Sequence, residues 1–124
     1  MTDEVRLHFD RADSCLAEAD VLFQGRWYAA AVARAYYAMF HAATAALLHR
    51  DIRRRSHKGL ISAFGQFLVK PGHVEAGLHK SFAEAFDLRQ HSDYQPLVDL
   101  TENQANEVLA RATKFVAACK GLVS

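Results

Sequence analysis

The sequence has few of the residues that make tight turns or covalent cross-links. Its 124 residues include only two prolines, six glycines and two cysteines. So few turn-forming residues argue against an all-β fold, because such folds need many tight turns. Cys15 and Cys119 lie far apart, and no secretory leader follows Met1. We therefore expect buried thiols in a reducing, cytoplasmic environment.

Sequence patterns for metals and cofactors are missing as well. The seven histidines show no paired spacing with cysteine, which argues against a zinc site. No Walker A, Gly-x-Gly-x-x-Gly or Gly-x-Ser-x-Gly motif occurs, so the common nucleotide-loop and hydrolase patterns are lacking. We therefore expect neither a bound metal nor a cofactor.

Charge of one sign and long apolar runs are scarce too. The 15 basic and 14 acidic residues leave a formal net charge of +1, which argues against a protein that coats nucleic acid through bulk charge. Residues 27–48 are long enough to span a membrane, but Arg34 and His41 interrupt them, so we expect no membrane association. With 51% apolar residues, the chain is expected to fold as one domain over residues 1–124.

Apolar residues recur at the three- and four-residue spacing of amphipathic helices over most of the chain. The first helix is expected to begin after Thr2 and to end at Gly25 in a left-handed conformation. The second is rich in alanine and apolar on nearly every side, so we expect it at the centre of the bundle or in a dimer interface. The expected helices cover residues 3–24, 27–50, 56–69, 74–91 and 101–119, with a loop at 92–100. The predicted fold class is all-α, an up-and-down bundle of four long helices and one short helix.

One segment departs from the overall charge balance. Between Arg50 and Lys58 there are five basic residues, opposed only by Asp51. A solvated loop is the simpler interpretation of such a cluster. Arginines beside a helix start also favour phosphate. The candidate nucleotide- or RNA-binding residues of this segment are Arg53, Arg54, Arg55, His57 and Lys58.

Three motifs together resemble a known family. They are Arg-Ala-Tyr-Tyr-Ala-Met-Phe-His at residues 34–41, His-Lys-Gly at 57–59, and Leu-Arg-Gln-His-Ser-Asp-Tyr at 88–94. In this order they resemble the small, stand-alone prokaryotic HEPN-domain proteins, and the resemblance covers nearly the whole chain. It implies a HEPN-like bundle that forms a homodimer and works with a minimal nucleotidyltransferase as a toxin–antitoxin-type pair. It also implies a polar cleft for nucleotide or RNA, with the motif residues Arg34, Tyr37, His41, Asp93 and Tyr94 as candidates.

The same resemblance raises the question of ribonuclease activity. Many HEPN proteins are metal-independent ribonucleases with an arginine followed, after four to six residues, by a histidine in a late helix. Such cleavage needs a base for the 2′-hydroxyl and a cation for the phosphorane. Here Arg89 occupies that region, but His91 follows after one residue and no later histidine exists. The usual motif is therefore absent, and Arg89 with His91 is the candidate catalytic pair.

Two other pairs have a similar spacing, Arg34 with His41 and Arg50 with His57. The first is the alternative pair, because residues seven apart on a helix share one face. Their spacing is no evidence in itself, since chance gives about as many such pairs in this chain. A purely structural interpretation also exists, in which Asp87 or Asp93 neutralises Arg34 inside the bundle. Three functions stay open: a nucleotide- or RNA-binding toxin–antitoxin component, a dimeric metal-independent ribonuclease, and a structural helical subunit with no nucleotide site.

Overall fold

The computed structural model describes residues 1–94 and 99–123, without the side chains of Asp93 and Tyr94. Every regular element among the described residues is helical, so the all-α prediction is confirmed. The elements are α1 (Asp3–Gln24), α2 (Tyr28–Leu48), α3 (His57–Phe64), the π-helical segment η1 (Gly65–Val69), α4 (Ala76–Tyr94) and α5 (Glu102–Gly121).

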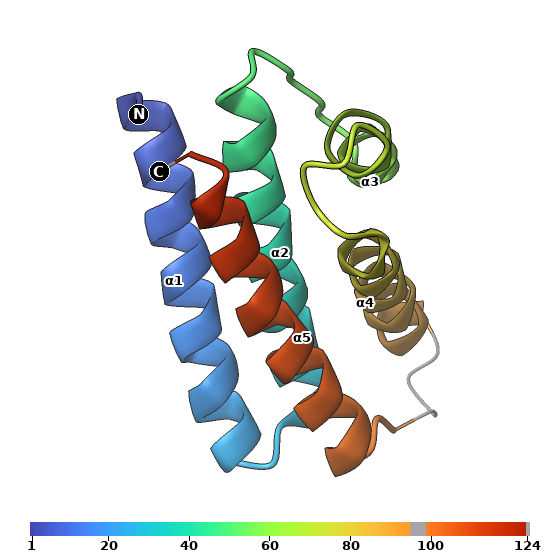
Figure 1. Ribbon diagram of the computed structural model, residues 1–124. Coiled ribbons are helices and arrows are strands. Elements are labelled where there is room, and N and C mark those ends of the chain that lie inside the picture. The colour runs from blue at the N-terminus through green and yellow to red at the C-terminus, as the bar shows by residue number, and fades with distance from the viewer. Residues whose placement is uncertain (95–98, 124) are drawn as a thin grey trace.

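The long helices alternate in direction, and α2 lies at their centre. In Figure 1, α1 descends and α2 returns upward beside it. Helix α4 descends to the right of α2, and α5 returns upward against α1 and α2. Contacts join α2 to α1, α5, α4 and α3. Its alanines permit this, because small side chains let several helix backbones approach closely. No helix in the described part of the chain is both long and apolar enough to cross a membrane.

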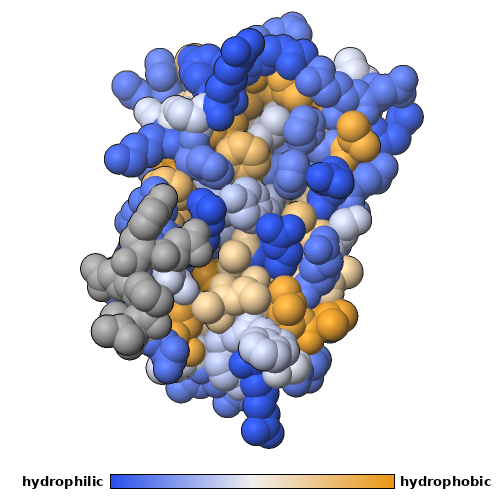
Figure 2. Space-filling view, turned by 180° about the vertical axis from the view of Figure 1, so that it is seen from behind, coloured by the Kyte–Doolittle hydropathy of each residue, from blue (hydrophilic) through white to orange (hydrophobic). Residues whose placement is uncertain are grey.

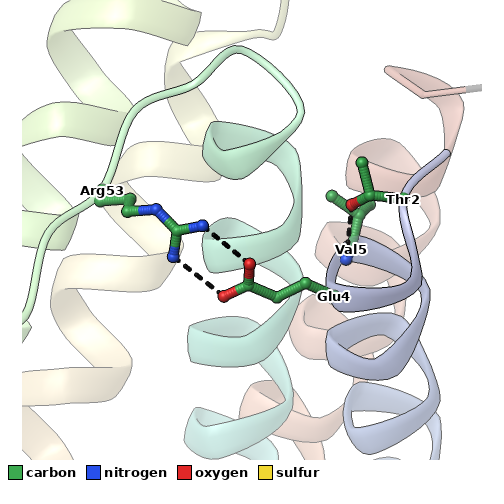
Figure 3. A network of polar contacts seen from close by, with 4 residues as sticks. All are labelled: Thr2, Glu4, Val5 and Arg53. Carbon is green, nitrogen blue, oxygen red and sulfur yellow. Dashed lines mark hydrogen bonds and ion pairs between the residues drawn. The ribbon is translucent and has the colours of Figure 1, made fainter.

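Hydroxyl caps begin the helices where the sequence predicts them. Thr2 accepts the Val5 amide at 3.2 Å (Figure 3), and Thr101 forms a reciprocal capping box with Gln104. Ser56 accepts the Gly59 amide at 2.9 Å, and a Cβ at Gly59 would lie 2.7 Å from the Ser56 hydroxyl oxygen. Glycine at this position therefore leaves room for the cap that begins α3.

An aromatic cluster joins α2 to α3, α4 and α5. Phe64, Phe82 and Phe115, from α3, α4 and α5, are fully buried. Their ring centroids lie 4.9 Å apart for Phe64 and Phe115 and 5.1 Å apart for Phe82 and Phe115. Tyr36 of α2 stacks on Phe82 at 5.9 Å. One cluster thus fixes the position of α4 relative to α2, on which the site described below depends.

The turn after α1 differs from the prediction. Gly25 is not left-handed, since its φ is −79°; the left-handed residue is Arg26, with φ of 67°. The turn closes when the Trp27 amide donates to the Leu22 carbonyl at 2.9 Å. A Cβ at Gly25 would lie 2.9 Å from Cδ1 of Trp27. Glycine is used here for the close approach of the indole rather than for its backbone freedom.

Replacing Arg26 by glycine is expected to stabilise the protein by about 0.5–1 kcal/mol, because a left-handed conformation strains a residue with a Cβ. Urea denaturation measures the change. Arg6→Gly, within α1, is the matched control and should lower stability by about 1 kcal/mol. A loss of stability in both variants would contradict the strain at Arg26.

Two other boundaries also differ from expectation. The fourth helix runs from Ala76 to Tyr94 rather than over 74–91, so part of the expected loop is helical. The expected helix at 56–69 changes to a π-helix at Gly65, where the Lys70 amide donates to the Gly65 carbonyl at 2.9 Å. Most of the remaining expected loop, residues 95–98, lies outside the described residues.

Candidate functional site

One side of α2 is left uncovered by the other helices. Figure 2 views the molecule from the side opposite α5, and apolar atoms lie in the middle of this view, interrupted by hydrophilic ones. On α2, Arg34, Tyr37, Phe40 and His41 are half-buried, whereas most of the residues between and beside them are fully buried. We call these four residues the α2 face. The helix is therefore central but not covered on every side.

Two arginines converge on Tyr37 in this face. The guanidinium carbon of Arg34, one turn earlier on α2, lies 5.0 Å from the centroid of the Tyr37 ring. That of Arg89, from α4, lies at the same distance, and 5.8 Å from the ring of Tyr36. Cation–π contacts of this kind contribute about 0.5–1 kcal/mol at exposed sites. The fold thus brings together three residues from two separate motifs.

The partner of Arg34 comes from an unexpected helix. Its Nη1 lies 3.9 Å from Oε2 of Glu18 on α1, and the two side chains are 38% and 53% exposed. The expected partner Asp87 instead lines a groove between α4 and α5. The other expected partner, Asp93, has a side chain outside the described residues. A long, solvated ion pair neutralises Arg34 only weakly.

His57 lies in an aromatic pocket at the start of α3. Its ring centroid is 4.9 Å from that of Phe40 and 5.6 Å from that of Phe86. A hydrogen bond of 2.6 Å joins its Nδ1 to the hydroxyl of Tyr36. Burial, and then the charge of Arg89, lower the pKa of His57, which favours the neutral imidazole. A neutral histidine and an arginine therefore occur near each other although they are distant in sequence.

His41 lies on the opposite margin of the α2 face, against α1. Its ring stacks on that of His8 with centroids 5.3 Å apart, and the two Nδ1 atoms are 3.1 Å apart. Burial lowers the pKa of His41 to about 4, with further contributions from His8, Arg11 and Arg34. Burial likewise lowers the pKa of His8. This pair is uncharged at neutral pH, and the sequence pattern did not indicate His8 or Arg11.

The His41 pair predicts a loss of stability in mild acid. The pKa of His41 falls from its ordinary value of 6.5 to about 4 on folding, so between these values the unfolded chain binds a proton that the folded chain does not. The stability that the protein has because folded His41 stays neutral is fully present above pH 6.5 and is lost as the pH falls toward 4.

Urea denaturation near pH 7 and near pH 4.5 measures this effect. His41→Asn should lose less stability between the two pH values than the wild type, whereas Leu7→Ala, at an exposed position of α1, should lose as much. An unchanged pH dependence in His41→Asn would rule out His41 as its source.

Arg89 and His91 are placed on different sides of α4. Arg89 contacts the rings of Tyr36 and Tyr37 on α2. His91 is exposed and lines a groove of about 370 Å³ between α4 and α5, over Met39. The structure does not bring the two side chains together on one surface, so the Arg89–His91 pair stays a prediction.

The basic segment before α3 is partly neutralised. Arg53 donates two hydrogen bonds to the Glu4 carboxylate, at 2.9 and 2.7 Å (Figure 3), which ties the segment to α1. Arg54 donates to the Arg53 carbonyl at 2.7 Å and lies 5.8 Å from the Phe67 ring centroid. Arg55 and Lys58 are exposed, with no ion pair among the described residues. These two cations are the most available for a ligand.

Neither cysteine has the surroundings of a reactive thiol. Cys15 and Cys119 are free and buried, as expected. Burial raises the pKa of both thiols, which keeps them protonated and unreactive at neutral pH. Among the described residues, no group of three or more histidine, cysteine, aspartate or glutamate side chains is arranged to hold a metal ion.

The protein is an all-α bundle, and its central helix has arginine and aromatic side chains on the α2 face. The sequence matches the HEPN domain over residues 5–122. The chain therefore belongs to the HEPN domain family, and the resemblance noted from its motifs is confirmed.

Several small prokaryotic proteins are similar to this chain over most of its length. A protein of Methanocaldococcus jannaschii named "Putative toxin MJ0605" is 34% identical, over 92% of this chain and 84% of its own. A "UPF0332 protein" of Thermotoga maritima is 33% identical, over 91% of this chain and 86% of its own. A second M. jannaschii protein, "Putative toxin MJ0142", is 26% identical over 91% of this chain.

Proposed function

We propose that this protein is the HEPN component of a toxin–antitoxin-type pair, that it acts with a minimal nucleotidyltransferase, and that it binds RNA or nucleotide on the α2 face. Membership of the HEPN family and the names of two relatives support the toxin-like role. The observation that carries the binding proposal is the convergence of Arg34 and Arg89 on Tyr37.

The chemistry of this convergence suits a nucleotide. A guanidinium presents a planar set of donors that matches the oxygens of a phosphate. The aromatic rings of Tyr37 and Phe40 lie in the same half-buried face, where bases can stack without regard to their identity. The exposed Arg55 and Lys58 lie beside the start of α3 and extend the positive surface. The face therefore combines phosphate-binding and base-stacking groups.

The uncovered side of α2 also supports the proposed homodimer. Tyr37 and Phe40 are large, half-buried rings on a helix whose other sides are packed. A second copy of the chain placed beside this face would cover part of it, leave the Tyr37 ring open to a base, and bring two sets of Arg34 and Arg89 together. The RNA would then bind in a groove formed by both copies.

Co-expression with a minimal nucleotidyltransferase from the same genome tests the partner proposal. We expect one complex on size-exclusion chromatography with light scattering, with a mass that contains two HEPN chains. Arg111→Ala, on the α5 side of the molecule, serves as a surface control and should not alter the elution. Two separate peaks under native salt would contradict the proposal.

A metal-independent ribonuclease is the second candidate, because His57, whose lowered pKa favours the neutral imidazole, and Arg89 both contact Tyr36. In this proposal His57 takes the proton of a 2′-hydroxyl, whose oxygen bonds to phosphorus, and Arg89 stabilises the phosphorane. The bond between phosphorus and the 5′-oxygen breaks, and this oxygen takes a proton from water, which produces a 2′,3′-cyclic phosphate and a 5′-hydroxyl. His57 then releases its added proton to water. Cleavage that survives a chelator is expected.

Two histidine variants separate the possible bases. Loss of cleavage in folded His57→Asn supports the pair of His57 with Arg89, whereas loss only in His91→Asn supports the pair of Arg89 with His91. Full cleavage in both variants would exclude either histidine as the base. Circular dichroism of each variant shows whether the helices are retained.

A further inference from the structure

A polar cavity lies between α1 and α2, next to the α2 face. It has a volume of about 350 Å³. Three of its residues, Arg34, Tyr37 and His41, come from one side of α2. The wall formed by α1 consists of Arg11, Ser14, Cys15 and Glu18. The cavity therefore includes residues that neither the HEPN motifs nor the basic segment contains.

The charges of this cavity do not balance. Arg11 has no carboxylate partner among the described residues, and the ion pair of Arg34 with Glu18 is long, at 3.9 Å. Two arginines thus face one glutamate. At one end His41 is paired with His8 through the 3.1 Å contact of their Nδ1 atoms, and both imidazoles are neutral at pH 7. The cavity carries a net positive charge that the chain itself does not neutralise.

We propose that this cavity is a phosphate-binding site that holds a phosphate monoester group through the guanidiniums of Arg11 and Arg34, assisted by the hydroxyls of Ser14 and Tyr37. The inference deepens and rests on the proposed binding of RNA or nucleotide at the α2 face. Tyr37 belongs to both the cavity and the α2 face, so a nucleotide whose base contacts the α2 face can place its terminal phosphate between α1 and α2.

The shape and chemistry of the cavity favour phosphate. Two guanidiniums from different helices approach a ligand from two sides, which suits a tetrahedral group with several acceptor oxygens. Hydroxyl groups supply further donors to the remaining oxygens. The volume of 350 Å³ accommodates such a group together with water, since each water occupies about 30 Å³ in the liquid.

Neighbouring His41 provides an internal reporter for the site. The positive charges of Arg11 and Arg34 help to hold the pKa of His41 down. An anion bound between these arginines offsets that effect, so the pKa of His41 rises when the site is filled. Nuclear magnetic resonance of the histidine rings therefore detects occupancy without any measurement of RNA binding.

The test is a titration of the full-length protein with inorganic phosphate, adenosine 5′-monophosphate and adenosine, followed by calorimetry and by the His41 ring signals. Phosphate and the monophosphate should bind and shift His41, and adenosine alone should not. Tighter binding of the monophosphate identifies a terminal nucleotide phosphate as the source, and equal binding identifies free phosphate. Adenosine binding as tightly as the monophosphate would overturn the proposal, as would the absence of phosphate binding at millimolar concentration.

Variants of α1 separate this site from the proposed function. Arg11→Ala should weaken phosphate binding by about tenfold to a hundredfold, while the matched control Arg6→Ala on the same helix should not. Unchanged binding in Arg11→Ala overturns the phosphate site. If phosphate fails to bind but RNA binding still depends on Arg89, the inference fails and the proposed function stands. If phosphate binding depends on Arg11 in a protein that binds no RNA, the proposed function fails and the phosphate site stands.

Discussion

Replacing Phe82 by alanine is expected to lower the free energy of unfolding by about 3–5 kcal/mol. The Phe82 ring is fully buried and contacts Phe115 at 5.1 Å, and both Phe64 and Tyr36 at 5.9 Å. These rings belong to four different helices. The truncation therefore leaves a cavity at the point where α4 is held to α2, and the surrounding rings cannot close it without moving a helix.

Urea denaturation with two matched variants measures this cost. Phe82→Leu keeps most of the volume and should lose less than half as much stability as the alanine variant. Leu7→Ala, at a position 59% exposed, should change stability by no more than about 0.5 kcal/mol. A loss in Phe82→Ala as small as that in Leu7→Ala would show that the cluster does not hold α4 to α2.

Replacing Arg89 by alanine is expected to weaken the binding of single-stranded RNA by about tenfold to a hundredfold. Its guanidinium lies 5.0 Å from the Tyr37 ring centroid, and a hydrogen bond to a charged group contributes about 1.5–3 kcal/mol. Arg89→Lys keeps the charge but lacks the planar set of donors, so its affinity for RNA should lie between those of the wild type and of Arg89→Ala. Fluorescence anisotropy of labelled RNA at a fixed salt concentration measures all three, because phosphate contacts depend strongly on salt.

Arg111 provides the matched control for this measurement. It lies on α5, where it forms ion pairs with Glu84 at 3.0 Å and with Glu107, away from the α2 face. Arg111→Ala should bind RNA as the wild type does. An equal loss of affinity in Arg89→Ala and Arg111→Ala would mean that RNA binding depends on the total charge of the protein rather than on a site at Tyr37.

Much of the fold could be predicted because its signals are local. The caps at Thr2, Ser56 and Thr101 depend on residues within one turn, and each appears in the structure. The alanine-rich character of α2 likewise indicated its central position. The left-handed Arg26 could not be predicted, because its conformation follows from the hydrogen bond that Trp27 makes to Leu22 across the turn. The π-helical segment after Phe64 also has no distinct pattern in the sequence.

The sequence indicated several residues of the candidate site but not their arrangement. The motifs indicated Arg34, Tyr37 and Arg89, but their convergence depends on how α4 packs on α2. The partner of Arg34 proved to be Glu18, and α1 lies outside all three motifs. Similarly, His57 was selected for its place beside a basic segment, whereas its hydrogen bond with Tyr36 arises only from the contact of α2 with α3.

The near-zero net charge of the chain is compatible with RNA binding because the cations are unevenly distributed. Arg53 is held by Glu4 and contributes mainly to the position of its segment. Arg55 and Lys58 stay exposed, and Arg34 has only a long ion pair. The overall charge therefore does not show where the cations that are available to an RNA phosphate lie.

Photo-crosslinking to a single-stranded RNA that contains 4-thiouridine tests the central claim most directly. Mass spectrometry of the digested protein then identifies the peptides that carry RNA. We predict crosslinks on the α2 peptide that contains Tyr37 and on the peptide that contains His57, and their loss in Arg89→Ala. Crosslinks confined to α5 (Glu102–Gly121), or equally spread over all helices, would contradict an RNA site on the α2 face.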